Sequence, residues 1–352
     1  MNIVLVHPIF NWASGDISRA FEKALIKMGY NVKIFDTYSK LSQVRKKFKF
    51  IKDIYINPHF IDEFCFKEFL DDIKNKKVDL VIFIHGNMVP KKVLRFLNEN
   101  KINTAVWFLD DPHEIDLSSK YSKYFSFIFT DEKNAVSVHL RNNKNVFYLP
   151  VGYDEDIYFP AEEKDERYIS DICVAANGFK ERIELLEKIY PKISKYNIKI
   201  VGNWSFLSLS SPLRKHVMTN DIIAPKELAR YYRGAKIVLN PHRDPYGLSL
   251  GSNLFNVEAI SPNPRVFEAT ACASFMITDD YRKDVFSYFE KGVEIDSFSN
   301  TEELTYKINY WLSNDYKRKE GAKKAAKKAL SHTIYLRAQE LLKKCINVVY
   351  AY

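Results

Sequence analysis

The chain has 352 residues, 46% of them hydrophobic and 28% charged, with 13 Pro, 11 Gly and no low-complexity tract, which excludes a fibrous or largely disordered protein. Its length fits two domains of about 150–170 residues better than a single core. The net charge is +9, and four scattered Cys without a CxxC pair exclude a disulfide framework and a zinc site.

The first half alternates apolar strands with helices. The N-terminus lacks the basic start and long apolar core of a signal peptide, and no stretch approaches the roughly 20 apolar residues of a membrane span, so we expect a cytoplasmic protein. Runs rich in β-branched and aromatic residues predict a parallel sheet covered on both faces, a Rossmann-like domain. We expect a helix at 16–29 and strands at 2–6, 31–36, 78–86, 103–112, 125–132 and 145–152.

The second half repeats this scheme after a Pro-containing, charged join at 148–168. It predicts a second Rossmann-like domain, with domain limits at 1–160 and 161–330. Ligand is expected at the carboxyl ends of the strands, where two sheet edges would face each other across a cleft. We expect strands at 169–178, 198–203, 235–240 and 274–280, and helices at 180–196, 225–234 and 301–315.

The C-terminal segment carries most of the positive charge. Between Lys317 and Lys344 there are ten basic and two acidic side chains. Ala and Leu recur there at helical spacing, from Ala322 through Leu330 to Leu342, so we expect 331–352 to be a helix that packs back on the N-terminal domain. The lysines are either a solvated face or a surface for anionic lipid or an acidic acceptor at the inner face of the membrane. The aromatic residues of the chain lie mainly in apolar strand or helix patterns rather than interleaved with this basic run, which disfavours nucleic acid.

Six motifs spread from about Asn103 to Arg337 resemble one family. They are "WFLDDP" (107–112), "YLPVGYDEDIYFP" (148–160), "DICVAANGFKER" (171–182), "AKIVLNPHRD" (235–244), "NPRVFEATACASFMITDD" (263–280) and "SHTIYLRAQELL" (331–342). With the two-domain layout, the chain resembles GT-B glycosyltransferases of the glycosyl transferases group 1 superfamily, in particular the spore-maturation glycosyltransferase-like proteins. The resemblance implies a GT-B fold with an acceptor side in the N-terminal domain and a nucleotide-sugar side in the C-terminal domain.

Two positions depart from that family's pattern. Related enzymes carry Gly where this chain has Ala273. Many members also have two Glu eight residues apart, whereas the position eight before Glu268 is Ile260 and the neighbouring Glu258 is out of register.

Glu268 is the principal candidate for donor binding. Pro264 suits the first position of a helix, so Glu268 lies about one turn inside it. The resemblance implies that this carboxylate accepts hydrogen bonds from the ribose diol of the donor. The alternative is an ion pair between Arg265 and Glu268 at i,i+3. The other residues that we expect at the nucleotide site are Asn263, Gly178, Asn240 and His242.

A departing nucleoside diphosphate carries negative charge, which fixed cations and backbone N–H groups can stabilise. Lys180 and Arg182 stand in the first turn of a helix after a Gly-containing turn, an unfavourable place for a cation unless it serves an anion. We predict that they contact the diphosphate, with Arg265 as a third candidate.

Asp110, Asp111 and His113 follow a strand of the first domain and are candidates for holding acceptor hydroxyls or acting as a base. The alternative is turn capping by Asp before Pro. His7 and His85 also end strands of this sheet and could line the cleft. The "DED" string at 154–156 reads as a solvated turn of the join, so we expect no metal site.

The sequence therefore predicts an enzyme: a metal-independent, retaining glycosyltransferase that moves a sugar from a nucleotide diphosphate sugar, with UDP-sugars favoured, to a protein or cell-surface glycan. Two alternatives stay open. One is another GT-B enzyme, such as a nucleotide-sugar epimerase or an inverting heptosyl-type transferase. The other is a non-catalytic structural or binding protein with this fold.

Overall fold

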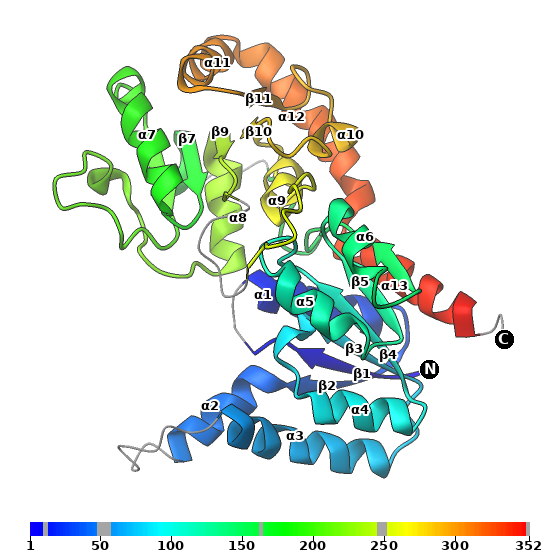
Figure 1. Ribbon diagram of the computed structural model, residues 1–352. Helices are drawn as coiled ribbons and strands as arrows, with labels where there is room; N and C mark the ends of the chain where they lie inside the picture. Colours follow the sequence, from blue (N-terminus) through cyan, green and yellow to red (C-terminus); the bar gives the residue numbers. More distant parts are fainter. Residues whose placement is uncertain (10–12, 48–57, 162–164, 245–251, 350–352) are drawn as a thin grey trace. The chain divides into compact units, whose positions relative to one another are not determined.

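The computed structural model describes residues 1–9, 13–47, 58–161, 165–244 and 252–349 (Figure 1). The chain divides into two compact units. Counting only the described residues of each range, unit 1 comprises Met1–Pro150, Leu248–Glu258 and Ile334–Tyr352, and unit 2 comprises Val151–Gly247 and Ala259–Thr333. Both ends of the chain thus belong to unit 1.

Unit 1 is built on a parallel sheet of six strands in the order β2-β1-β3-β4-β5-β6. The two central strands are buried at every position except Asn103, as their largely apolar sequences predict. The strands are β1 (Asn2–His7), β2 (Asn31–Asp36), β3 (Leu80–Ile84), β4 (Asn103–Phe108), β5 (Phe127–Thr130) and β6 (Val146–Tyr148).

The helices of unit 1 cover this sheet. A core of Val, Leu and Phe side chains, among them Phe66, Phe69 and Phe83, joins helices to strands on one face. The helices are α1 (Ala13–Lys27), α2 (Thr37–Lys47), α3 (Pro58–Lys74), α4 (Lys91–Glu99), α5 (Ile115–Ser122), α6 (Val136–His139) and α13 (Ile334–Val349), with short 3₁₀ turns η1 (Gly86–Met88) and η2 (Lys133–Ala135).

Unit 2 has a parallel sheet of five strands in the order β11-β10-β9-β7-β8. They are β7 (Ser170–Ala175), β8 (Ile198–Val201), β9 (Ala235–Asn240), β10 (Phe275–Asp279) and β11 (Asp296–Phe298). The helices are α7 (Lys180–Ile193), α8 (Pro225–Gly234), α9 (Pro264–Ala271), α10 (Val285–Tyr288), α11 (Thr301–Ser313) and α12 (Asp315–Ala329), with 3₁₀ turns η3 (Glu166–Tyr168), η4 (Arg214–His216) and η5 (Leu330–His332). Two parallel sheets flanked by helices confirm the predicted α/β class.

The strand order of each sheet reverses once. In unit 1 the chain runs outward from β1 to β2, then returns to place β3 on the other side of β1; in unit 2, β7, β8 and β9 do the same. At such a switch point the loops that follow two neighbouring strands diverge to opposite faces, which leaves room for a ligand at the carboxyl edge. The candidate positions are therefore the loops after β1 and β3, and those after β7 and β9.

The boundary between the units lies earlier than the predicted residue 160. Tyr153 is buried, its N–H donates to the carbonyl of His332 at 3.3 Å, and it bridges to Thr333, so the chain from Val151 already belongs to unit 2. Gly152 is required at this crossing, because a Cβ there would stand 2.5 Å from the carbonyl oxygen of His332. The "LPVG" and "SHT" motifs meet here.

The described residues of Leu248–Glu258 also leave the predicted second domain and group with unit 1. The Asp116 carboxylate accepts hydrogen bonds from the Ser252 hydroxyl and from the Leu254 N–H, the latter at 2.9 Å. Val257 packs into a small cluster with Ile115 and other side chains of unit 1. These contacts place this segment in unit 1, and no local sequence pattern predicts them.

The basic C-terminal segment forms two helices rather than one apolar stripe. Helix α12 ends at Ala329, Leu330 is 65% exposed, and Thr333 has extended backbone before α13 begins. The prediction of a buried stripe was therefore wrong at Leu330. Helix α13 packs on α1 with Leu341 and Leu342 buried. No helix in the described part of the chain combines the length and apolarity that crossing a membrane demands.

Helix α9 begins and ends as its sequence requires. The Asn263 side chain accepts the Val266 N–H at the N-cap, and Pro264 follows. At the other end the N–H of Ala273 donates to Thr270 and that of Ser274 to Ala269, which is the double hydrogen bond of a Schellman motif. Ala273 holds the left-handed position of this motif with φ of 56°. Gly would adopt this conformation without strain.

Replacing Ala273 by Gly should therefore stabilise the protein, by about 1 kcal/mol, since a left-handed backbone costs a residue with a Cβ about 1–2 kcal/mol. Ala271→Gly is the matched control two residues earlier. Ala271 is helical and buried, so Gly there should destabilise by about 1 kcal/mol or more. Urea unfolding measures both. Equal destabilisation by the two substitutions would contradict this account of Ala273.

Candidate functional site

The carboxyl edge of the unit 2 sheet gathers most of the residues predicted for donor binding. Asn240 ends β9 and is fully buried. Its side-chain oxygen accepts hydrogen bonds from the Arg265 guanidinium and from Asn263 Nδ2, the latter at 3.0 Å. Its Nδ2 lies 3.3 Å from Thr278 Oγ1 on β10. The buried amide thereby fixes Arg265 at the first turn of α9.

A buried pair of His242 and Asp279 lies beside this amide. The His242 backbone N–H donates to Asp279, and His242 Nδ1 lies 3.0 Å from Asp279 Oδ1. Burial lowers the pKa of His242, against the charge of Asp279, which raises it. Burial by itself would raise the pKa of Asp279, but the His242 charge and its hydrogen bonds hold that pKa below its ordinary value. The pair links the ends of β9 and β10.

Arg182 lies across the switch point of unit 2. Its side chain is buried, Nε donates to the Pro241 carbonyl at 2.9 Å, and a terminal nitrogen donates to the Asn177 carbonyl at 3.0 Å. Burial lowers its pKa to about 9, and the nearby charges of Arg265 and Arg243 act in the same direction. Arg182 therefore connects the loops after β7 and β9 at a place where positive charge accumulates.

Three other predicted donor residues differ in their surroundings. Lys180 is exposed at the start of α7, with Nζ 3.8 Å from Glu184. The Gly178 N–H donates to the Asn203 carbonyl at 2.8 Å, and a Cβ on Gly178 would lie 2.5 Å from the Trp204 ring, so this Gly allows close packing. Glu268 is half-buried on α9, and its charge contributes to the raised pKa of buried Tyr232, of which burial is the main cause.

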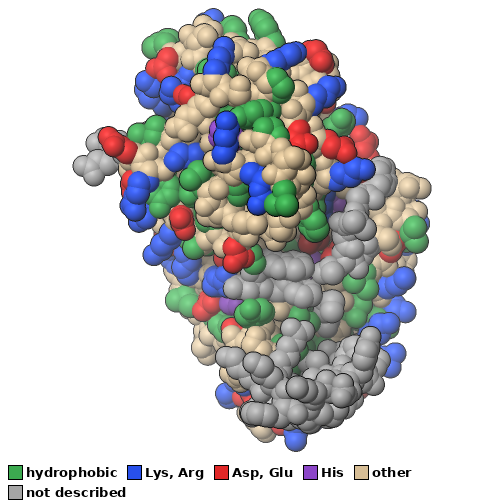
Figure 2. Space-filling model, turned by 90° about the vertical axis from the view of Figure 1, so that its left-hand side faces the viewer, with side chains coloured by type: hydrophobic (Ala, Val, Ile, Leu, Met, Phe, Trp, Pro, Cys, Tyr) green, Lys and Arg blue, Asp and Glu red, His purple; other side chains and the backbone are tan. Residues whose placement is uncertain are grey.

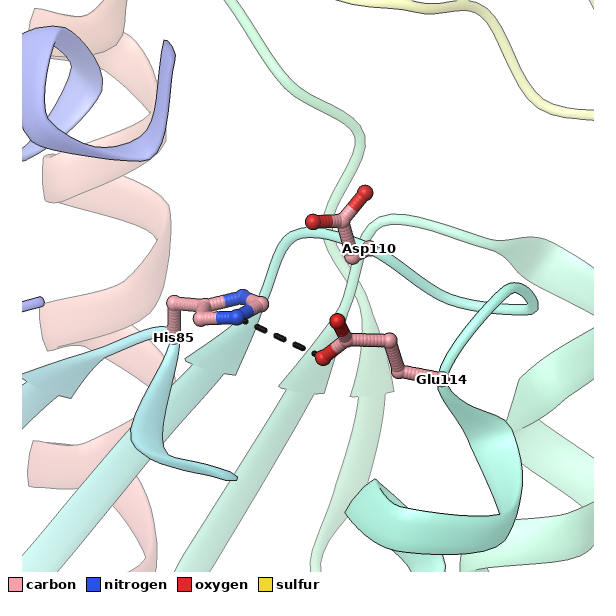
Figure 3. A group of neighbouring side chains, drawn as sticks. All are labelled: His85, Asp110 and Glu114. Carbon is pink, nitrogen blue, oxygen red and sulfur yellow. Dashed lines mark ion pairs between the residues drawn. The ribbon is translucent and has the colours of Figure 1, made fainter. Parts of the chain in front are cut away.

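In unit 1, the loops after β3 and β4 bring together His85, Asp110 and Glu114 (Figure 3). One candidate ligand atom of each lies within 4.8 Å of the others. His85 Nε2 is 3.4 Å from Glu114 Oε2, and Asn87 Nδ2 donates to the same oxygen at 2.7 Å. Burial and the Asp110 charge raise the pKa of Glu114, against His85 and the Asn87 hydrogen bond, which lower it.

Asp111 has a different environment from its neighbour Asp110. Its carboxylate accepts hydrogen bonds from the hydroxyls of Ser118 and Thr130 and pairs with His139 Nε2, each at 2.7 Å. His139 Nδ1 in turn lies 2.6 Å from Ser122 Oγ. The imidazole and the carboxylate are both buried. Asp111 is thus engaged in a core network that fastens α5 and α6 to β5, and its predicted role towards the acceptor stays untested.

The remaining acceptor-side candidates follow the strand ends as expected. His113 is buried one residue before Glu114. His7 ends β1, with Nε2 3.4 Å from Glu22, and burial lowers its pKa. Glu114 and Asn87 are not among the residues predicted from sequence. The signal that could have found them is positional, because each follows a strand of the same parallel sheet and β3 and β4 are neighbours.

Comparison with known proteins defines the class. Residues 182–343 match the family model described as glycosyl transferase-like. Sucrose-phosphate synthase from Thermosynechococcus elongatus has the same fold, with a TM-score of 0.66 at 13% identity over 100% of both chains. HepE from Anabaena in complex with UDP and glucose has a TM-score of 0.64 at 10% identity over 99% of this chain and 100% of that one. The chain has the GT-B fold of these glycosyltransferases, and part of it, residues 182–343, matches the glycosyl transferase-like family model.

A particular relative also matches. The chain is 25% identical to the spore protein CgeB of Bacillus subtilis (strain 168) over 259 residues, which are 72% of this chain and 78% of the relative. The predicted resemblance to GT-B glycosyltransferases and spore-maturation proteins is confirmed.

The contrast between two adjacent aspartates can be measured. Asp111→Ala should cost about 3–5 kcal/mol of unfolding free energy, because it leaves His139 buried without its partner. Asp110→Ala, at a half-buried edge position, should cost less than about 1 kcal/mol.

The pH dependence gives a second measurement. Burial opposes ionisation of Asp111, but His139 and the hydroxyl donors hold its pKa below the ordinary value. Its stabilising contribution is therefore present above the unfolded pKa of about 3.9 and is lost as pH falls through the folded pKa. Urea unfolding from pH 7 down to about pH 2 should show a larger loss of stability in wild type than in Asp111→Ala, which keeps only the contributions of other carboxylates. Equal losses of unfolding free energy in Asp111→Ala and Asp110→Ala would contradict the conclusion that Asp111 belongs to the core network and Asp110 does not.

Proposed function

We propose that this enzyme transfers a sugar from a nucleotide diphosphate sugar, with UDP-sugars favoured, to a protein or cell-surface glycan, with retention of anomeric configuration. Unit 2 binds the donor and unit 1 the acceptor. The observation that carries the proposal is the arrangement on α9, where Arg265 donates to the side-chain oxygen of Asn240, which also accepts from Asn263, three residues before Glu268.

The chemistry of transfer suits that arrangement. The bond from the anomeric carbon to the diphosphate oxygen breaks, a bond to the acceptor oxygen forms, and negative charge develops on the diphosphate. Arg265 stands at a helix N-terminus, where both the guanidinium and the helix dipole favour an anion. Arg182 and Arg243 add positive charge nearby. Such fixed groups stabilise the leaving diphosphate without a divalent cation in unit 2.

Glu268 would then face the nucleoside. It lies on the same helix as Arg265, three residues further from the N-terminus, so a ligand whose diphosphate contacts Arg265 could present its ribose diol to this carboxylate. Ionised carboxylates accept strong hydrogen bonds from vicinal hydroxyls. The preference for UDP rests on HepE, which was solved with UDP and glucose.

Retention requires no protein base, because a phosphate oxygen of the donor can take the proton from the acceptor hydroxyl. Inversion would require one, and Asp110, Asp111 and His113 are the predicted candidates. The second candidate function is that of a nucleotide-sugar epimerase or an inverting heptosyl-type transferase, and the third is that of a non-catalytic binding protein.

A thermal-shift panel of UDP-, GDP-, ADP-, CDP- and dTDP-sugars tests the proposal. A ligand at 100 times its dissociation constant stabilises by about 2.7 kcal/mol, so the correct donor should raise the melting temperature by a few degrees. Slow release of the nucleoside diphosphate without acceptor should accompany it. If no nucleotide sugar in the panel binds, both enzyme hypotheses are contradicted, and the hypothesis of a non-catalytic protein remains.

Peripheral contact with an anionic membrane is a further part of the proposal. Helix α12 exposes Lys319, Lys323 and Lys328, but these pair with Asp315, Glu320 and Glu294 respectively. On the face drawn in Figure 2, Lys and Arg side chains stand in separate groups among carboxylates. Electrostatic attraction by these lysines supports weak contact only.

Glu268→Gln should weaken binding of the nucleoside diphosphate on the order of 10- to 100-fold, because hydrogen bonds to a charged group are worth about 1.5–3 kcal/mol each. Folding should change little. Calorimetric titration measures the affinity, and Glu184→Gln, an exposed carboxylate of the same unit, is the matched control that should leave it unchanged.

The sugar of the nucleotide supplies an internal control. A 2′-deoxyribose nucleotide should bind wild type more weakly than the ribose form, yet bind the Glu268→Gln variant about as well as the ribose form does. If wild type does not distinguish the two, the ribose role of Glu268 is wrong. A loss of stability with unchanged affinity would instead favour an ion pair with Arg265.

A further inference from the structure

The His85, Asp110 and Glu114 cluster of unit 1 is not used by the proposed sugar transfer. Its three side chains come from the loops after two neighbouring strands, β3 and β4, and converge as Figure 3 shows. The 3.4 Å between His85 Nε2 and Glu114 Oε2 is close to the separation of two ligands on one small cation with metal–ligand distances of about 2.0–2.2 Å.

The imidazole is buried with unused hydrogen-bonding capacity. The His85 side chain is 6% exposed, and its Nδ1 has no hydrogen-bond partner among the described residues. Asn87 Oδ1 is in the same condition, although Asn87 Nδ2 donates to Glu114. A buried polar atom without a partner costs about 1–3 kcal/mol. Two such atoms beside a pair of carboxylates indicate a ligand-binding site.

The charge of the cluster points to a cation. The groups that face Glu114 are His85, Asn87, Asp110 and, further away, Asp111. Glu114 is buried, and the carboxylate of Asp110 stands beside it, so two acidic groups gather around one imidazole. A cation bound between these side chains would place positive charge beside both carboxylates.

The backbone that positions the imidazole of His85 is conformationally strained. His85 has φ of 56° and ψ of 59°, the left-handed conformation that a residue with a Cβ rarely adopts. Its N–H donates to the Trp107 carbonyl of β4 at 2.8 Å. The next residue must be Gly, because a Cβ on Gly86 would stand 2.8 Å from Val106 Cγ2. Strained residues that the surrounding structure over-determines concentrate at functional sites.

We propose that His85, Asp110 and Glu114 bind a divalent transition-metal cation. One imidazole nitrogen with two carboxylate oxygens suits zinc, cobalt or manganese, whereas calcium and magnesium prefer oxygen ligands alone. The site goes beyond the proposed sugar transfer and does not depend on it. It departs from the expectation that the chain has no metal site, and it makes Asp110 a ligand rather than a base.

The test uses full-length protein without an affinity tag, treated with EDTA and dialysed. Titration with Co²⁺, followed by visible absorption, should show one equivalent bound, and Zn²⁺ should displace it, since zinc binds such ligand sets more tightly than cobalt. Zn²⁺ should also raise the melting temperature. His85→Gln and Glu114→Gln should each weaken Co²⁺ binding at least about 10-fold.

Two variants keep the result interpretable. Asp110→Asn changes a half-buried ligand with little risk to folding and should also weaken binding. His216→Gln removes a half-buried histidine of unit 2 that stands 3.2 Å from the Tyr190 hydroxyl, and it should leave binding unchanged. The proposal fails if wild type binds no stoichiometric Co²⁺, or if folded Asp110→Asn binds it as well as wild type. UDP affinity of the same variants should be unaltered, so failure here is separable from failure of the donor site.

Discussion

Parallel strands end on the same edge of a sheet, and in both units the order of the strands reverses beside the first one. This single constraint determines where polar groups can accumulate. The loops after β1 and β3, and those after β7 and β9, diverge to opposite faces, so the edge between them is not closed by a crossover. Arg182 links the two loops in unit 2, and His85 stands at the corresponding place in unit 1.

Buried polar groups at these edges differ in how completely their hydrogen bonds are satisfied. Asp111 and His139 are satisfied completely by hydroxyls and by each other, so they act as rigid connections within the core. Asn240 likewise uses its amide to orient Arg265. Around His85, by contrast, two buried polar atoms, His85 Nδ1 and Asn87 Oδ1, have no hydrogen-bond partner among the described residues. The sequence surroundings of these residues look alike, so the difference in hydrogen bonding is evident only in the folded structure.

The sequence predicted what depends on local pattern. Buried strands, the Pro264 start of α9 and the two-unit α/β fold all follow from runs of apolar residues and from capping chemistry. Contacts between distant segments could not be predicted in this way. Asp110 and Asp111 are adjacent and chemically identical, yet one is at a half-buried edge and the other in the core. Glu114 meets His85 only because β3 and β4 are neighbours.

The assembly of unit 1 from three separate stretches has a consequence for biosynthesis. Its last helix, α13, covers α1 with side chains that lie within the final 20 or so residues of the chain. During translation at about 5–20 residues per second, the apolar face of α1 therefore emerges early and stays uncovered until residues 334–349 have been synthesised. Unit 2 is complete sooner, because it ends at Thr333. The amino-terminal unit is thus the later of the two to close, and nascent-chain chaperones would meet it open.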